Sequence, residues 1–182
     1  MRRPLSMPRS ISLSQLTWST PDGRTLFSDL DLQFGPVRTG LVGRNGTGKT
    51  TLLKLLTGEL PPLSGEARLH VPHAVLDQHV SLIDRGLSVA ENFRRRNPEA
   101  RETECRAALA RFRFRAEAAL QGADSLSGGE TLRAGLACVL GGENPPPLLI
   151  LDEPTNHLDM ESIEILEAGL KAYDGALIAV SH

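Results

Sequence analysis

The sequence contains little that would mark a secreted, membrane-embedded or metal-binding protein. It has only two cysteines, Cys105 and Cys138, and their spacing matches no metal or redox motif, so we expect two reduced thiols on helices. The longest apolar stretches, 148–151 and 176–180, are far shorter than the ~20 residues of a membrane-spanning helix. No apolar run follows the basic residues near the start, so we expect no secretion signal. These absences predict a cytoplasmic protein with no direct membrane insertion.

The net charge of the chain excludes few classes of partner. The formal net charge of −2 argues neither for nor against a nucleic-acid partner, and 182 residues suffice for one domain with a sizeable core. One basic run, Arg94–Arg96, is preceded by Phe93 and followed by Arg101. Two interpretations of this run remain open, namely a contact with RNA and a solvated helical face.

A glycine-rich motif at 43–50 matches the pattern G-x-x-x-x-G-K-[ST] at every fixed position. Glycines let successive backbone N–H groups point at phosphate oxygens, and the following helix adds its positive dipole end. Lys49 would supply a charge to the β- and γ-phosphates and Thr50 a hydroxyl to Mg²⁺. The predicted phosphate-binding residues are Gly43, Asn45, Gly46, Thr47, Gly48, Lys49, Thr50 and Thr51.

Two adjacent carboxylates follow the apolar strand 148–151. Neighbouring side chains at a strand end can diverge, so Asp152 and Glu153 can have different tasks. We expect Asp152 to bind magnesium, partly through water, and Glu153 to orient or deprotonate the attacking water, a role that contributes ~10²–10⁴-fold in rate. With the glycine-rich motif, this pair predicts hydrolysis of a nucleoside triphosphate.

A second anion-binding motif is predicted at Leu126-Ser127-Gly128-Gly129-Glu130, which opens a helix. Ser127 can cap this helix, and the two glycines leave backbone N–H groups bare. Ser-Gly-Gly alone is a common loop sequence, and its position upstream of the acidic strand is what favours a functional interpretation.

Strand and helix patterns alternate along the chain, which predicts an α/β protein with a parallel sheet and a ligand at the carboxyl ends of its strands. Asp159 is predicted to cap the last helix. The expected strands are 16–19, 25–27, 30–34, 40–42, 67–71, 74–77, 148–151 and 176–180. The expected helices are 51–60, 91–96, 99–115, one beginning at Ser127, and 160–172.

These motifs, in this order and together with Gln78, Asn156–Asp159 and His182, resemble the ATP-binding cassette (ABC) superfamily over nearly the whole chain. The resemblance implies a P-loop NTPase fold with a mainly parallel core sheet, an N-terminal antiparallel β subdomain and a small helical subdomain at about 86–140. It further implies one nucleotide-binding domain over 11–182 after a flexible tail, 1–10, and it implies ATP and Mg²⁺ as ligands.

The resemblance also assigns roles to single residues. Gln78 corresponds to the Q-loop, near the γ-phosphate and the metal, and His182 to the switch histidine. The motif 126–130 corresponds to the signature, which closes over the ATP of a second cassette. Trp18 is placed to stack on adenine, with a core aromatic as the alternative. The D-loop residues are Asn156, His157, Leu158 and Asp159.

The segment 153–159 reads Glu-Pro-Thr-Asn-His-Leu-Asp and more narrowly resembles the ABC-F branch, whose members lack membrane domains and many of which act on ribosomes. The implied partners are a second cassette and the ribosome or its RNA, with antibiotic resistance as one role. Two alternatives remain open: an ATPase subunit of a membrane transporter with separate transmembrane subunits, and a non-hydrolysing ATP-binding fragment. Because cassettes normally continue beyond the switch histidine, we expect the C-terminal end of the cassette to be missing. The part of the chain through the phosphate loop resembles the first cassette of an ABC-F protein, and the part with motifs 126–130 and 156–159 resembles the second cassette. An internal deletion that joined the two cassettes would produce such a chain.

Overall fold

The structure, a computed structural model, describes residues 11–156 and 158–181. The chain divides into two compact units. The first unit comprises the residues up to His73 together with 147–152 and the residues from Gly175 onward. The second unit comprises Ala74–Pro146 and Glu153–Asp174. The chain therefore passes from the first unit to the second after His73 and again at the bond between Asp152 and Glu153.

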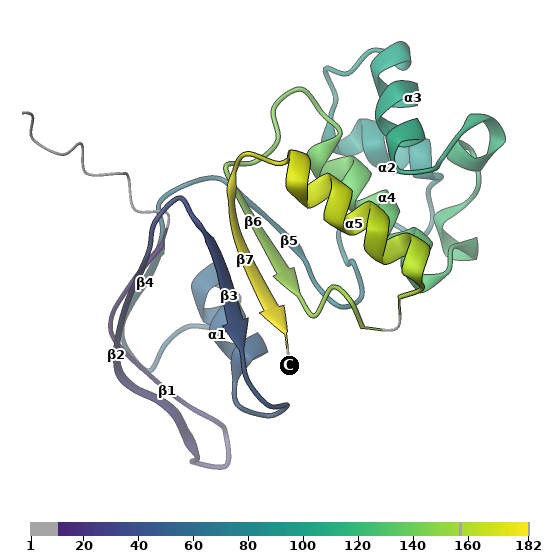
Figure 1. The fold of residues 1–182 in the computed structure, drawn as a ribbon. Helices are drawn as coiled ribbons and strands as arrows, with labels where there is room; N and C mark the ends of the chain where they lie inside the picture. The colour runs from purple at the N-terminus through teal and green to yellow at the C-terminus, as the bar shows by residue number, and fades with distance from the viewer. Residues whose placement is uncertain (1–10, 157, 182) are drawn as a thin grey trace, which may run out of the picture. The chain divides into compact units, whose positions relative to one another are not determined.

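The first unit contains an antiparallel sheet of β1 (Ile11–Ser19), β2 (Thr25–Phe34) and β4 (Ser64–Leu69), in the order β2-β1-β4 (Figure 1). A turn at 20–24 joins β1 to β2, and the N–H of Gly23 donates to the carbonyl of Thr20 at 2.9 Å. Strand β4 begins at Ser64, earlier than predicted, because Ser64 already pairs with Thr17 of β1. This sheet is the antiparallel β subdomain that the resemblance implied.

A parallel sheet forms the other layer of the first unit. Strand β7 (Ala176–Ser181) pairs in parallel with both β3 (Arg38–Val42) and β6 (Leu148–Asp152). All five residues of β6 are buried, as expected for a central strand of a parallel sheet that is covered on both faces. Strand β5 (His73–Leu76) begins at the boundary of the two units. The sheet delivers the carboxyl ends of β3, β6 and β7 to the same edge.

Helix α1 (Lys49–Thr57) follows the glycine-rich loop, and its four leucines are buried. The prediction that it runs to residue 60 is wrong. The helix stops because Gly58 adopts a left-handed conformation, φ 78°, and its N–H donates to the carbonyl of Leu55. A glycine at this place ends helices readily, since it has no Cβ to oppose the positive φ.

The second unit is mainly helical, and α4 packs against the other three α-helices. Its elements are α2 (Val89–Arg96), α3 (Glu102–Arg111), the 3₁₀ turns η1 (Ala116–Ala119) and η2 (Ala123–Ser125), α4 (Gly128–Leu140) and α5 (Met160–Ala172). The single helix predicted over 99–115 is wrong at both ends. Arg101 caps α3, with its N–H donating to the Glu104 carboxylate at 2.8 Å, and Arg113 turns the chain with φ 70°. Helix α5 and its Asp159 cap are as predicted.

The arginine run at 94–96 lies on α2, and the structure favours the interpretation as a solvated face. The Phe93 side chain is fully buried and therefore cannot stack on a base. Arg94 pairs with Glu102, Arg95 with Asp84, and Arg101 with Glu104, so carboxylates already neutralise these guanidinium groups.

Both cysteines lie on helices and are buried without a disulfide, and burial raises the pKa of Cys138 to about 12. Within residues 11–156 and 158–181, no helix has the length and apolarity needed to cross a bilayer.

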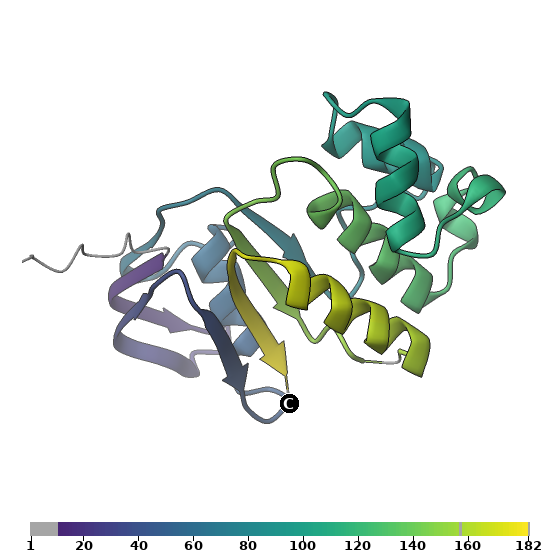
Figure 2. The same ribbon diagram turned by 45° about the horizontal axis from the view of Figure 1, so that its top comes forward.

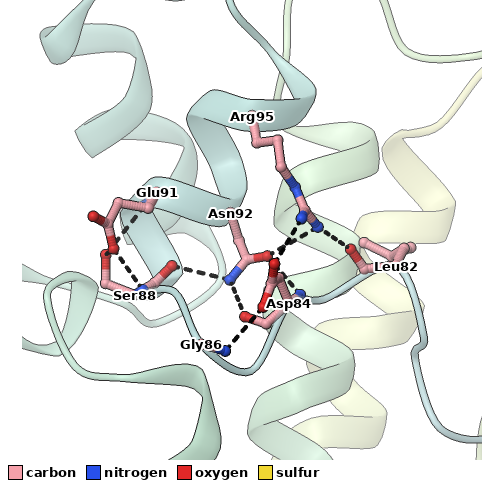
Figure 3. Close-up of polar contacts among 7 residues, drawn as sticks. All are labelled: Leu82, Asp84, Gly86, Ser88, Glu91, Asn92 and Arg95. Carbon is pink, nitrogen blue, oxygen red and sulfur yellow. Dashed lines mark hydrogen bonds and ion pairs between the residues drawn. The ribbon is translucent and has the colours of Figure 1, made fainter.

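A buried asparagine organises the segment that leads into α2 (Figure 3). Asn92 is only 1% exposed, and its amide oxygen accepts the N–H of Asp84 at 2.8 Å. Its amide nitrogen donates to the carbonyls of Asp84 at 2.8 Å and Ser88 at 3.1 Å. Arg95 closes the cluster by donating to the Asp84 carboxylate at 3.0 Å. The Asn92 side chain thus ties both ends of the segment 84–88 together.

We predict that Asn92→Ala lowers the free energy of unfolding by about 2 kcal/mol, because it removes three hydrogen bonds and leaves the N–H of Asp84 without its amide acceptor. Urea denaturation followed by circular dichroism measures this loss. Arg95→Ala is the matched control, since its ion pair is nearly half exposed and contributes about 0.5 kcal/mol. Equal stability of the Asn92→Ala chain and the wild type would contradict the assigned role.

Candidate nucleotide-binding site

The glycine-rich loop lies between the end of β3 and the start of α1. Its first residue is tied to the sheet, because the Gly43 N–H donates to the carbonyl of Ser181 at the end of β7, at 3.3 Å. The Thr47 hydroxyl donates to the carbonyl of Arg44 at 2.8 Å, which closes the loop on itself. A hollow of about 490 Å³ lies at residues 42–45. The sheet and the helix thus hold the loop at both ends.

Gly48 is required for two independent reasons. Its φ of 95° is a conformation that residues with a Cβ rarely adopt. A Cβ there would also lie 3.2 Å from Leu26 Cδ1 and 3.2 Å from Phe27 Cζ of β2. Sequence reasoning identified only the need for the backbone to curl, and the packing against β2 becomes visible only in the fold.

The Lys49 ammonium group lies inside the loop. It donates to the carbonyl oxygen of Gly43 at 2.6 Å and to that of Arg44 at 3.1 Å. An ammonium group has three donors and no acceptor, and here it adds its charge to the positive end of α1. This arrangement places a strong positive potential where the loop is predicted to bind phosphates.

Thr50 and Asp152 are 102 positions apart in sequence and meet in the first unit. The Thr50 hydroxyl donates to Asp152 Oδ2 at 3.1 Å, and Asp152 is 5% exposed at the end of β6. A hydroxyl oxygen and a carboxylate oxygen are ligands that suit Mg²⁺, which binds proteins through one or two such groups and keeps several waters. The donor set therefore fits the metal that was predicted for these two residues.

Glu153, which follows Asp152, has a left-handed backbone with φ 52°. Its carboxylate accepts the Asn156 Nδ2 donor at 2.6 Å, and its carbonyl accepts the Asn156 N–H at 3.2 Å. Such a conformation is costly for a residue with a long side chain and occurs often at functional sites. The contact of Asn156 with Glu153 was missed from the sequence, where Asn156 was assigned only to the D-loop.

The signature motif forms the start of α4 in the second unit. The Ser127 side chain accepts the N–H of Glu130 at 3.3 Å, and the Glu130 carboxylate accepts the N–H of Ser127 at 2.9 Å. These hydrogen bonds, led by the one from the Ser127 backbone, lower the pKa of Glu130. Leu126 is buried and anchors the turn, whereas Ser127 and Gly128 are exposed. The motif is therefore rigid and open to solvent.

The other predicted residues divide between the two units. Trp18 is half-buried on β1 of the first unit, opposite Phe27, which in turn lies against Gly48. In the second unit, Gln78 is exposed just after β5, and Leu158 is half-buried before the Asp159 cap. Thr51 is half-buried on α1. His157 and His182 lie outside the described residues.

Comparison with known proteins agrees with this geometry. The family described as ABC transporter matches residues 28–156. An uncharacterised ABC transporter ATP-binding protein of Schizosaccharomyces pombe is 39% identical over 181 residues, which cover 96% of this chain and 24% of that protein. The probable ATP-binding protein YheS of Escherichia coli K12 is 36% identical over 185 residues, covering all of this chain and 29% of YheS. Mouse ATP-binding cassette sub-family F member 3 is 36% identical over 179 residues, which cover 96% of this chain and 25% of the mouse protein.

Solved structures support the fold. A bacterial Atm1-family ABC exporter with ATP bound superposes with a TM-score of 0.79 at 21% identity, covering 98% of this chain and 35% of the exporter. An inward-facing ABC transporter of metal-chelate type gives a TM-score of 0.74 at 22% identity, and the match covers 97% of this chain and 74% of the transporter chain.

The chain spans about a quarter of the length of these curated relatives. The matched family, the superposed cassettes and the geometry of residues 43–50 and 148–153 agree with one another. The chain belongs to the ABC transporter family as an ATP-binding cassette, and its relatives include members of the ABC-F branch.

Proposed function

We propose that this cassette binds ATP with Mg²⁺ and hydrolyses it while it faces a second cassette. One observation carries the proposal: the hydroxyl of Thr50 donates to the carboxylate of Asp152 at 3.1 Å, directly beside the loop that holds Lys49. Two segments that are remote in sequence thereby assemble the donors that a magnesium triphosphate requires.

Thr50 and Asp152 would hold the magnesium ion, with water between Asp152 and the metal, and the Gln78 amide would join them. The bound ion would neutralise charge on the phosphate oxygens. The backbone N–H groups of the loop and Lys49 bind the phosphates, and Trp18 stacks on the adenine.

Glu153 accepts a proton from the water that attacks the γ-phosphate, and Asn156 orients its carboxylate through the 2.6 Å hydrogen bond. The attack breaks the bond between the γ-phosphorus and the bridging oxygen, and ADP leaves with phosphate. His182 is proposed to contact the γ-phosphate, and His157 to belong to the D-loop.

A second cassette completes each site. Ser127 and Gly128 are exposed at the positive end of α4, a 13-residue helix, so this end can approach a γ-phosphate held by another chain. The D-loop, 156–159, leads into the neighbouring helix α5. The second cassette is another copy of this chain or the second cassette of a longer protein.

For the cellular role we propose an ABC-F protein that acts on the ribosome, with antibiotic resistance as one outcome. The sequence of segment 153–159, which includes the D-loop, supports this branch, as do the sub-family F relatives. The alternative is an ATPase subunit docked on separate transmembrane subunits. Sedimentation of the Glu153→Gln chain with ATP distinguishes them, since co-sedimentation with ribosomes supports the first role and with membranes the second.

The ATPase itself is tested by metal removal. Purified chain with ATP and Mg²⁺ should release phosphate. Chelation by EDTA should abolish the release, and excess Mg²⁺ should restore it, because the triphosphate is bound and activated with its metal. Phosphate release that is unchanged in EDTA would contradict the magnesium site. The absence of release under all conditions would favour the remaining alternative, a non-hydrolysing ATP-binding chain.

A further inference from the structure

Helices α4 and α5 pack against each other within the second unit (Figure 1 and Figure 2). Gly129 in the first turn of α4 lies against Ser162 in the first turn of α5. A Cβ on Gly129 would lie 2.4 Å from Ser162 Oγ and 3.2 Å from Ser162 Cβ. Its neighbour Gly128 differs, since a Cβ there would meet nothing within 4 Å. The two glycines of the signature therefore have different surroundings within the same unit, and only Gly129 is pressed against another helix.

Ser162 also holds the D-loop. It is 2% exposed, and its N–H donates to Asp159 Oδ1 at 2.8 Å. Hydrogen bonding by the Ser162 side chain is the leading cause of the lowered pKa of Asp159, ahead of the backbone hydrogen bond. The Asp159 Oδ1 atom lies only 3.7 Å from where a Gly129 Cβ would be. One serine thus contacts the signature on one side and the end of the D-loop on the other.

We propose that Ser162 is a positioning residue that fixes the spacing between the signature turn and the D-loop, so that both reach the second cassette as one rigid body. This inference rests on the proposed function, in which both segments serve a site shared with that cassette. Packed interiors do not deform smoothly, so an extra atom at this contact would displace one of the two turns. Ser162 itself would touch no nucleotide.

The proposal gives Gly129 a role that differs from the one inferred from sequence. If Gly129 only leaves an N–H group bare for phosphate, any side chain at 129 harms activity whatever occupies position 162. If Gly129 instead makes room for Ser162, the harm disappears once the serine side chain is removed. A double-mutant cycle separates these explanations, because residues in direct contact give non-additive effects.

The experiment compares Gly129→Ala, Ser162→Gly and the double variant with the wild type. Turnover at saturating ATP and the dissociation constant of a fluorescent ATP analogue are measured on each, with circular dichroism and thermal melting to establish folding. Glu164→Gly controls for the loss of helix propensity, since Glu164 is an exposed residue of the same helix. Ser162→Val tests the contact from the other side without altering the motif.

We expect Gly129→Ala to lower turnover roughly tenfold or more while the dissociation constant of the analogue changes less than about twofold. In the Ser162→Gly background, the same Gly129→Ala change should cost less than about twofold. Ser162→Val should also lower turnover in a chain that melts cooperatively. Glu164→Gly should match the wild type.

The proposal is overturned if Gly129→Ala is equally harmful in both backgrounds, or if folded Ser162→Val keeps wild-type turnover. A wild-type chain that binds the analogue and never turns over ATP would instead remove the proposed function, and the positioning role with it. Failure of the positioning role and failure of the proposed function are distinguishable, because the first appears only in the variants and the second appears in the wild type.

Discussion

Replacing Glu153 by glutamine should reduce ATP turnover by ~10²–10⁴-fold, the usual contribution of a positioned general base. Glutamine keeps the shape of the side chain and a carbonyl oxygen that can accept the Asn156 hydrogen bond, so the left-handed turn at 153 should persist. What is lost is the negative charge that accepts the proton of the attacking water. Steady-state phosphate release by the purified chain measures the effect.

ATP binding provides the internal control for this variant. Lys49, Thr50 and Asp152 are unchanged in Glu153→Gln, so the dissociation constant of ATP should stay within about threefold of the wild type. Any ATP-dependent dimer should live longer, because the step that opens it no longer occurs. Equal turnover of the two chains, in a preparation shown to hydrolyse ATP, would remove Glu153 from the mechanism.

Local signals in the sequence were sufficient for several elements. The apolar run before Asp152 predicted a buried strand, and β6 is buried throughout. The residues Ser127 and Asp159 predicted the starts of α4 and α5, because each side chain satisfies a backbone N–H that the first helical turn leaves unpaired. Such signals involve residues three positions apart, and they can therefore be read without the fold.

The errors had two kinds of cause: the pairing of distant residues, and turns within segments that were predicted as continuous helices. Strand β4 begins at Ser64 because β1 provides hydrogen-bond partners from there, and nothing in the local sequence specifies that register. The predicted helix over 99–115 ignored the left-handed turn at Arg113, a residue with no intrinsic preference for positive φ. Helix α1 ends where Gly58 adopts its left-handed conformation, before residue 60, the predicted end of the helix.

In the candidate site, too, some residues could be predicted from local motifs, whereas some contacts depend on the fold. The motif residues of the glycine-rich loop and the carboxylate pair were predicted from their spacing, because phosphate and metal chemistry requires those residue types. The contact of Asn156 with Glu153 and that of Ser162 with Gly129 were not identified. Each depends on where a turn or a helix places a side chain, and neither asparagine nor serine signals such a role by itself.

The second large effect is expected at the signature. Ser127→Arg should abolish hydrolysis while leaving ATP binding by an isolated chain nearly unchanged, because Ser127 would serve the site of the facing cassette. Arginine also removes the cap of α4, which costs about 1 kcal/mol. Ser127→Asp is the matched control: it retains a capping oxygen but brings a negative charge towards the phosphate. Both variants should be inactive, whereas an effect of the lost cap alone would spare the aspartate.

Lys49→Ala should behave in the opposite way. The Lys49 ammonium lies in the phosphate loop of its own chain, so its loss should weaken ATP binding directly. The dissociation constant should rise by about tenfold or more, as the loss of a charged hydrogen bond worth ~1.5–3 kcal/mol implies. Titration of a fluorescent ATP analogue at low protein concentration separates this variant from Ser127→Arg.

Mixing the two inactive chains tests the central claim most directly. In a heterodimer of Lys49→Ala and Ser127→Arg, one site combines an intact phosphate loop with an intact signature. We predict that ATPase activity reappears on mixing and rises with the fraction of heterodimer measured by differentially tagged chains. A mixture that forms heterodimers and remains inactive would contradict a site shared between two cassettes.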